Sequence, residues 1–182
     1  MTTATREFTG TFIADPDHSS LLFAVQHMKV SSFRATFGDV EARLESGESG
    51  ISLEGRARVA SISITNPPVF REHVVNGEEF FDGSNHPEIV FRSTRVELDE
   101  DGGVAVDGEL EIKGIARPVT ATGTYQPPIE DPFGASRTAI ELRSVVDRRD
   151  WDMNWQVPLP AGGEALGFEV ELTAHLELVK QG

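Results

Sequence analysis

The residues of this chain that could do chemistry are histidines, serines and a short run of arginines and tryptophans. His18 and Ser19 adjoin in Asp-Pro-Asp-His-Ser-Ser, His27 lies nine positions after His18, and Arg148 opens the run Arg-Arg-Asp-Trp. Imidazole, hydroxyl and guanidinium groups can hydrogen-bond the polar head of a ligand. The same types also fix turns through bonds from side chain to main chain. The sequence leaves both roles open.

Serine hydrolysis and metal binding are disfavoured by the spacing of these residues. Neighbouring residues on a strand rarely reach the aligned contact that a serine–histidine pair needs, and no Gly-x-Ser-x-Gly turn is present. A regular strand points His18 and His27 to opposite faces, which argues against a shared metal ion. The chain has five histidines without ligand spacing and no cysteine. We therefore expect no metal, no cofactor and no catalytic residue.

The composition argues against several classes of partner. Thirty acidic residues against sixteen Lys and Arg give a formal charge of −14, which repels nucleic-acid phosphates and anionic lipid headgroups. No apolar run approaches the ~20 residues of a membrane span, and the first residues do not follow a signal-peptide pattern. We expect no nucleic-acid partner, no stable membrane insertion and a cytoplasmic location. The length suits one domain over residues 1–182.

The elements that must position these residues are strands. From Leu166 to Leu178 every second residue is apolar or small, and the residues between them are mostly polar. Such alternation buries one face of a strand, and at ~3.3 Å per residue this strand would span roughly 40 Å. Similar alternation and turn signals predict strands over residues 7–14, 19–28, 36–46, 51–64, 88–99, 103–113, 118–126, 136–147 and 166–180.

One helix is predicted between Asn66 and Gly77, with Asn66 as its cap, prolines at its start and glycine at its stop. A second helical turn is expected around residues 148–154. Eight or more strands must form a sandwich or close into a barrel, and long strands with local connections favour an antiparallel barrel of about eight strands. Phenylalanines are numerous, and Gly55, Gly108 and Gly123 on apolar faces favour free space inside.

Several motifs in fixed order resemble the YceI-like family. They are Asp15 to His27, Phe33-Arg-Ala-Thr-Phe37, Glu79-Phe-Phe-Asp82 with His86-Pro-Glu-Ile-Val-Phe91, Gly108 to Val119, and Arg148 to Trp151. The resemblance implies an all-β, extended, lipocalin-like barrel. It also implies binding of a long isoprenoid chain, such as a polyprenyl quinone or polyprenyl phosphate, inside that barrel.

The leading hypothesis is therefore a carrier that is not an enzyme, with the lipid head near His18, Ser19, His27 and Arg148. The apolar tail is expected to meet a larger set of residues: Phe23, Val25, Phe37, Phe80, Phe81, Phe91, Leu110, Ile112, Trp151, Trp155, Phe168, Val170 and Leu172. One alternative is an enzyme that uses His18, His27 or Asp150 for proton transfer to a small apolar substrate. Another is an interaction module with a filled barrel. The sequence leaves a homodimer open.

Overall fold

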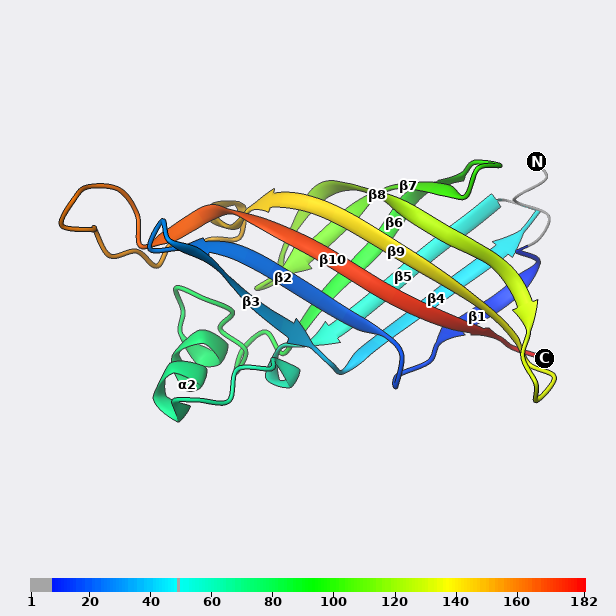
Figure 1. Ribbon diagram of the computed structural model, residues 1–182, viewed down its shortest axis with the longest axis horizontal. Coiled ribbons are helices and arrows are strands. Elements are labelled where there is room, and N and C mark those ends of the chain that lie inside the picture. The colour runs from blue at the N-terminus through cyan, green and yellow to red at the C-terminus, as the bar shows by residue number, and fades with distance from the viewer. Residues whose placement is uncertain (1–7, 49) are drawn as a thin grey trace.

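Ten strands form one antiparallel sheet in the computed structural model, which describes residues 8–48 and 50–182 (Figure 1). The strands are β1 (Gly10–Ala14), β2 (Ser20–His27), β3 (Ser31–Phe37), β4 (Val40–Gly47), β5 (Gly50–Arg58), β6 (Glu88–Leu98), β7 (Gly103–Ile112), β8 (Ile115–Glu130), β9 (Ser136–Asp147) and β10 (Leu166–Lys180). Their inward positions are apolar and their outward positions polar, as the period-two pattern requires.

The sheet closes because β10 pairs with β9 on one side and with β1 on the other. The ring runs β1-β4-β5-β6-β7-β8-β9-β10, and β2 and β3 extend β1 and β4 beyond short breaks. Ala14 of β1 lies opposite Leu178, whereas Ser20 of β2 lies opposite His175, so β10 passes from one to the other. The predicted eight-stranded antiparallel barrel is confirmed.

Some strand boundaries differ from the predicted ones. The expected strand 36–46 is two strands, β3 and β4, which meet at the break over residues 38–39. The expected strand 51–64 stops at Arg58, because the chain turns there into the 3₁₀ helix η1 (Val59–Ser61). The strand expected over 118–126 runs from Ile115 to Glu130, and residue 7 of the first lies outside the described residues.

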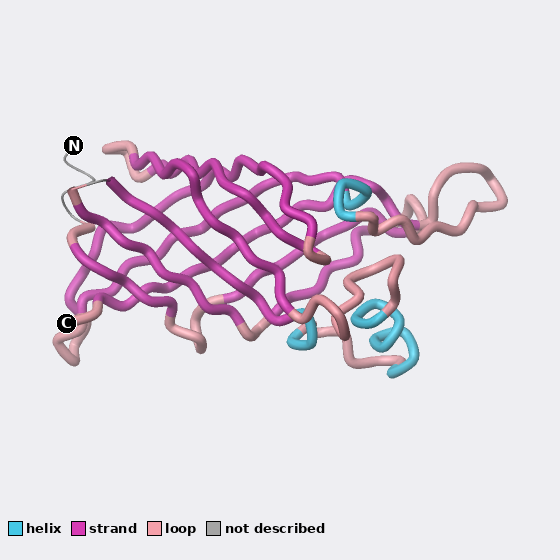
Figure 2. Tube along the Cα trace, turned by 180° about the vertical axis from the view of Figure 1, so that it is seen from behind, coloured by secondary structure: helices cyan, strands magenta, loops and turns pink. Residues whose placement is uncertain are grey.

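The helices gather at one end of the barrel. Helix α2 (Pro68–Asn76) and the turn between β2 and β3 lie at the same end as the 3₁₀ helix η2 (Arg148–Trp151) and the loop after it (Figures 1 and 2). The predicted helix and second turn are thus present. Asn66 does not cap α2, since Pro67 is the N-cap and makes no side-chain cap bond. No helix in the described part of the chain has the length and apolarity to cross a membrane.

The opposite end of the barrel is filled by its own side chains. Phe8 and Phe12 are fully buried there, and Phe8 packs edge-on against Tyr125 with ring centroids 5.4 Å apart. The Tyr125 hydroxyl donates to the Asp99 carbonyl oxygen at 2.8 Å. Leu44 and Leu178 add further fully buried volume. We call this the closed end.

Candidate functional site

A cavity of about 470 Å³ occupies the barrel beneath α2, and we call it the outer cavity. Twenty of the residues that line it are apolar: Leu21, Phe23, Val25, Phe33, Phe37, Pro67, Phe70, Val74, Phe80, Phe81, Ile89, Leu110, Ile112, Val146, Trp151, Met153, Trp155, Leu166, Val170 and Leu172. The polar remainder is His27, Asn66, His73 and Arg148. Its volume is within the range of small-molecule sites, and its lining suits a hydrophobic guest.

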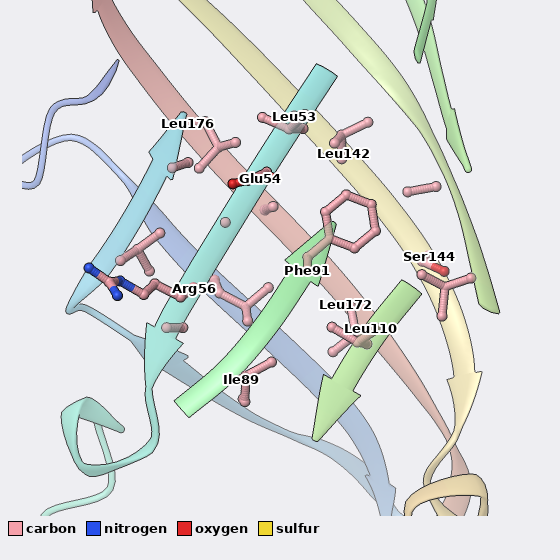
Figure 3. A pocket seen from close by; sticks show the side chains of 18 of the residues that line it. Leu53, Glu54, Arg56, Ile89, Phe91, Leu110, Leu142, Ser144, Leu172 and Leu176 are labelled. Atoms are coloured by element: carbon pink, nitrogen blue, oxygen red, sulfur yellow. The ribbon is translucent and has the colours of Figure 1, made fainter. Parts of the chain in front are cut away.

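A second cavity, the inner chamber, lies deeper in the barrel and has a volume of about 120 Å³. It shares Leu21, Ile89, Leu110 and Leu172 with the outer cavity, so the two are adjacent compartments of one interior. In Figure 3 the ring of Phe91 reaches into this chamber from β6. The structure therefore has internal space, whereas the hypothesis of an interaction module predicted a filled barrel.

Most of the residues expected around a lipid tail line this interior. Eleven of them border the outer cavity, and Phe91 borders the inner chamber: Phe23, Val25, Phe37, Phe80, Phe81, Leu110, Ile112, Trp151, Trp155, Val170, Leu172 and Phe91. They come from β2, β3, β6, β7 and β10 and from the segments after α2 and around η2. Inward alternation on the strands places them on a common face.

Phe168 does not line either cavity, which corrects its predicted place. The pairing of β10 with β2 shifts register between Leu166 and Val170, and this irregularity interrupts the alternation on which the prediction depended. The Phe168 ring instead lies beside two guanidinium groups, with Arg149 Cζ 4.1 Å and Arg148 Cζ 5.0 Å from its centroid. Phe168 thus makes cation–π contacts with Arg148 and Arg149.

Aromatic side chains form the outer part of the cavity wall. Phe80 and Trp155 stack with centroids 5.6 Å apart, although their residues lie on separate segments. Phe37 meets Phe81 edge-on at 5.4 Å, and Phe33 meets Phe70 of α2 at 6.1 Å. Such pairs add roughly 0.5–1.5 kcal/mol each beyond burial of area, so they tie α2 and its following loop to the barrel.

Arg148 is 4% exposed, and its guanidinium fixes the loop that follows η2. Nε donates to the Gly167 carbonyl oxygen at 2.8 Å, Nη1 to that of Met153, and Nη2 to those of Trp155 at 2.8 Å and Leu166 at 3.2 Å. These bonds use four of the five N–H groups of an arginine. The sequence allowed a structural role for Arg148, and the structure gives it one through main-chain carbonyls.

Among the described residues no carboxylate lies within ion-pair distance of Arg148, and Asp147 acts on its charge only at longer range. Asp147 bonds to Arg149 instead, with its Oδ1 2.9 Å from the Arg149 Nε, and this hydrogen bond lowers the pKa of Asp147. Burial lowers the pKa of Arg148, although an arginine stays protonated at any ordinary pH. A buried positive charge therefore borders the outer cavity.

Two polar residues that line the outer cavity, Asn66 and His73, were not predicted there. His73 of α2 lies 2.8 Å from Glu79 through its Nε2, and this hydrogen bond lowers the pKa of Glu79. Both side chains are more than two-fifths exposed, so the pair differs from the buried acid–base pair that an enzyme of this design would need. Asn66 was assigned to a cap. In the sequence, the sign that Asn66 and His73 could line the cavity was that both lie close to Phe70 and Phe80.

His18 and Ser19 lie outside both cavities, which corrects their predicted place beside a ligand head. The His18 Nδ1 is 3.2 Å from the Asp15 carboxylate, and Arg137 donates to Asp15 and to Glu177, at 2.8 Å each. Because the guanidinium of Arg137 already binds these carboxylates, the cluster is a network of ion pairs on the outer wall. His27, by contrast, borders the outer cavity at the end of β2.

Ser19 has a structural task at the break between β1 and β2. Its buried hydroxyl donates to the Glu177 carbonyl oxygen at 3.3 Å and accepts from the Glu177 N–H at 3.2 Å. Ser19 thereby bonds both main-chain groups of Glu177 where β10 passes from one partner strand to the next, and the carbonyl oxygen also accepts from the Asp15 N–H at 2.7 Å. Of the four residues expected around the polar head, only His27 and Arg148 are brought to the cavity.

The comparisons with known proteins agree with this architecture. A UPF0312 protein of Staphylococcus aureus strain N315 is 26% identical over 168 residues, which cover 91% of this chain and 95% of that protein. The crystal structure of Burkholderia cenocepacia BcnA superposes with a TM-score of 0.72 at 19% identity and covers 90% of this chain and 98% of that one.

A polyisoprenoid-binding domain from Saccharophagus degradans also has this fold. It superposes with a TM-score of 0.70 at 12% identity and covers 95% of this chain and 99% of that one. Among family models, the one described as the YceI-like domain matches residues 12–178, which is nearly the whole chain. This chain therefore belongs to the YceI-like domain family.

Proposed function

We propose that this protein binds and carries a long-chain isoprenoid-type lipid, with the tail in the barrel and the polar head near His27, His73 and Arg148. The observation that carries the proposal is the mainly apolar interior of two adjacent cavities, which has a buried arginine, Arg148, in the outer cavity and a filled closed end. The Saccharophagus degradans domain, which has this fold, is a polyisoprenoid-binding domain, and this supports the same class of ligand.

The size of the hydrophobic term favours a long tail. Each buried methylene contributes ~0.8 kcal/mol, so ten methylenes give roughly 8 kcal/mol, which corresponds to about micromolar affinity before the costs of association. A carrier with useful affinity needs a longer chain or a polar anchor. The outer cavity and the inner chamber supply length, and Arg148 supplies a positive group for an oxygen of the head.

Native mass spectrometry and organic extraction of the purified protein test the proposal. We expect copurified lipid, or uptake of added polyprenyl lipid with one molecule per chain. A protein that is empty and ignores added polyprenyl lipids would contradict the proposal. Val170→Phe fills the outer cavity from β10 and should reduce uptake, whereas Glu169→Phe on the exposed face of the same strand should not.

Two lipids with the same polyprenyl tail distinguish the head groups. A polyprenyl phosphate would pair with the guanidinium of Arg148, so its affinity should fall as salt is added. A polyprenyl quinone offers only neutral carbonyl oxygens, so its affinity should depend little on salt. The dissociation constants of the two lipids are measured at low salt and at high salt. The lipid that binds more tightly at each salt concentration has the preferred head.

A further inference from the structure

The inner chamber exists because small side chains face inward at one level of the barrel. Its wall includes Ala42, Gly55, Ala57, Ala121 and Ala174. Beyond this level the inward positions carry large side chains, and Leu44 and Leu178 are fully buried. Leu53 pairs with Leu44 across β4 and β5, and Leu53, Leu142 and Leu176 lie together at one end of the chamber in Figure 3. These three leucines form its floor.

Gly55 is the glycine that leaves this space open. A Cβ atom at Gly55 would lie 3.6 Å from the Glu41 carbonyl oxygen and 3.9 Å from the Ala42 Cβ, which are ordinary contacts. The backbone of Gly55 is also outside the left-handed region. A larger side chain could therefore be accommodated there without backbone strain, and because Gly55 lines the chamber this side chain would occupy it.

The other two glycines predicted to provide space do something else. A Cβ at Gly108 would lie 2.5 Å from Cζ of Phe91, so the phenylalanine ring already fills that site. A Cβ at Gly123 would lie 1.8 Å from the Glu141 carbonyl oxygen, so this glycine permits close approach of two strands. Of these three glycines, Gly55 alone contributes free volume to the chamber.

We propose that the inner chamber receives the distal end of the lipid tail and that Gly55 sets the longest tail the barrel can hold. This inference rests on the proposed function. The buried cation Arg148 borders the outer cavity, so the head stays there and the tail passes Leu110 and Leu172 into the chamber. The chamber is lined mainly by apolar residues, and of its polar ones Glu54 and Arg56 are exposed on the outside of β5. Because the closed end is filled, a tail that is too long leaves part of itself in water, and each methylene so exposed forgoes about a fourfold gain in affinity.

A series of isoprenoid alcohols that differ only in the number of isoprene units tests this inference, with competition against a fluorescent lipid as the measurement. For the wild-type protein we expect affinity to rise with tail length and then to level off. For Gly55→Val the affinity should level off at a shorter tail, and the longest tail that the wild type holds should bind on the order of tenfold more weakly. Short tails should bind both proteins equally, and Gly55→Ala should be intermediate.

Two further variants make the result specific. Ser52→Val adds a valine to the exposed face of the same strand and should behave as wild type. Leu176→Ala removes part of the floor, so its affinity should keep rising with tail length beyond the length at which the wild type levels off. If the wild type binds the series but Gly55→Val levels off at the same length, the role of Gly55 is refuted and the proposed function stands. If the wild type binds no member of the series, the proposed function itself is refuted.

Discussion

The Nη2 of Arg148 donates to the carbonyl oxygen of Trp155 at 2.8 Å, and through this bond the first residue of η2 holds a wall residue of the outer cavity in place. The Trp155 ring in turn stacks on Phe80, which follows α2. A buried arginine, a loop and a segment that is distant in sequence are therefore coupled beside the outer cavity. Because binding sites depend on such supporting contacts, this coupling can be tested through stability and through spectroscopy.

Arg148→Met should destabilise the protein by about 3 kcal/mol. The change removes the Arg148 donor from the carbonyl groups of Met153, Trp155 and Gly167, whereas the Leu166 carbonyl keeps its bond from Gln156. Loss of a partner costs roughly 1–3 kcal/mol where the acceptor stays buried. Urea denaturation measures the loss. Arg149→Met removes an exposed charge and should cost under about 1 kcal/mol, and equal losses in the two variants would refute the anchoring role.

Trp155 should report on lipid binding, whereas Trp151 should not. Trp155 is half-buried in the wall of the outer cavity, but Trp151 is 1% exposed and donates through Nε1 to the Leu110 carbonyl oxygen at 3.2 Å. Since the chain has two tryptophans, added polyprenyl lipid should shift the emission of the wild type to shorter wavelength. Trp155→Phe should abolish the shift and keep binding by native mass spectrometry. A shift that persists in this variant would place the response at Trp151.

The barrel was predictable because most of its strands alternate strictly. In β10 the residues from Val170 to Leu178 keep their inward and outward places, so this strand of 15 residues was identified along its whole length. The start of β3 was missed because the residues from Ser31 to Arg34 are mostly polar and lie largely exposed. Local hydrophobicity does not encode a strand that is held mainly by its pairing with β2.

The apolar lining of the outer cavity was easier to predict than its polar lining for a physical reason. Inward alternation places apolar residues on a common face, but it does not say at which height along the barrel a polar residue lies. His18 and Ser19 shared a motif with His27, yet one short break in the strand leaves His18 among the charges of Asp15 and Arg137. The partner Arg137 lies more than a hundred residues away in sequence, and no local pattern connects it to Asp15.

The ion pair between Arg137 and Asp15 should make stability depend on pH in acid. Hydrogen bonding to Arg137, with a smaller contribution from His18, lowers the pKa of Asp15 from 3.8 to about 2. A depressed folded-state pKa stabilises the protein above the unfolded pKa, and this stabilisation is lost as the pH falls towards 2. In Arg137→Met the pKa of Asp15 should rise, so the difference in unfolding free energy from the wild type should be largest above pH 3.8 and shrink below it.

Titration of the Asp15 carboxyl by NMR and urea denaturation at several pH values measure both effects. Arg143→Met on the exposed face of the same strand is the matched control, because Arg143 pairs with Glu141 and not with Asp15. This control should leave the pKa of Asp15 unchanged. An unchanged pKa in Arg137→Met would show that His18 or the local turn holds the carboxylate ionised.

Phe12→Ala should destabilise the closed end by about 3–5 kcal/mol, the usual cost of removing a buried phenylalanine ring. Phe12 is fully buried on β1, its ring lies 5.9 Å from that of Phe8, and it packs in the filled part of the barrel. Phe133→Ala is the matched control, since Phe133 is 94% exposed in the turn between β8 and β9 and its loss should change stability by under about 0.5 kcal/mol. Urea denaturation of the two variants measures the difference. Similar stabilities would mean that the closed end tolerates a void, and the floor of the inner chamber would then not limit the length of a bound tail.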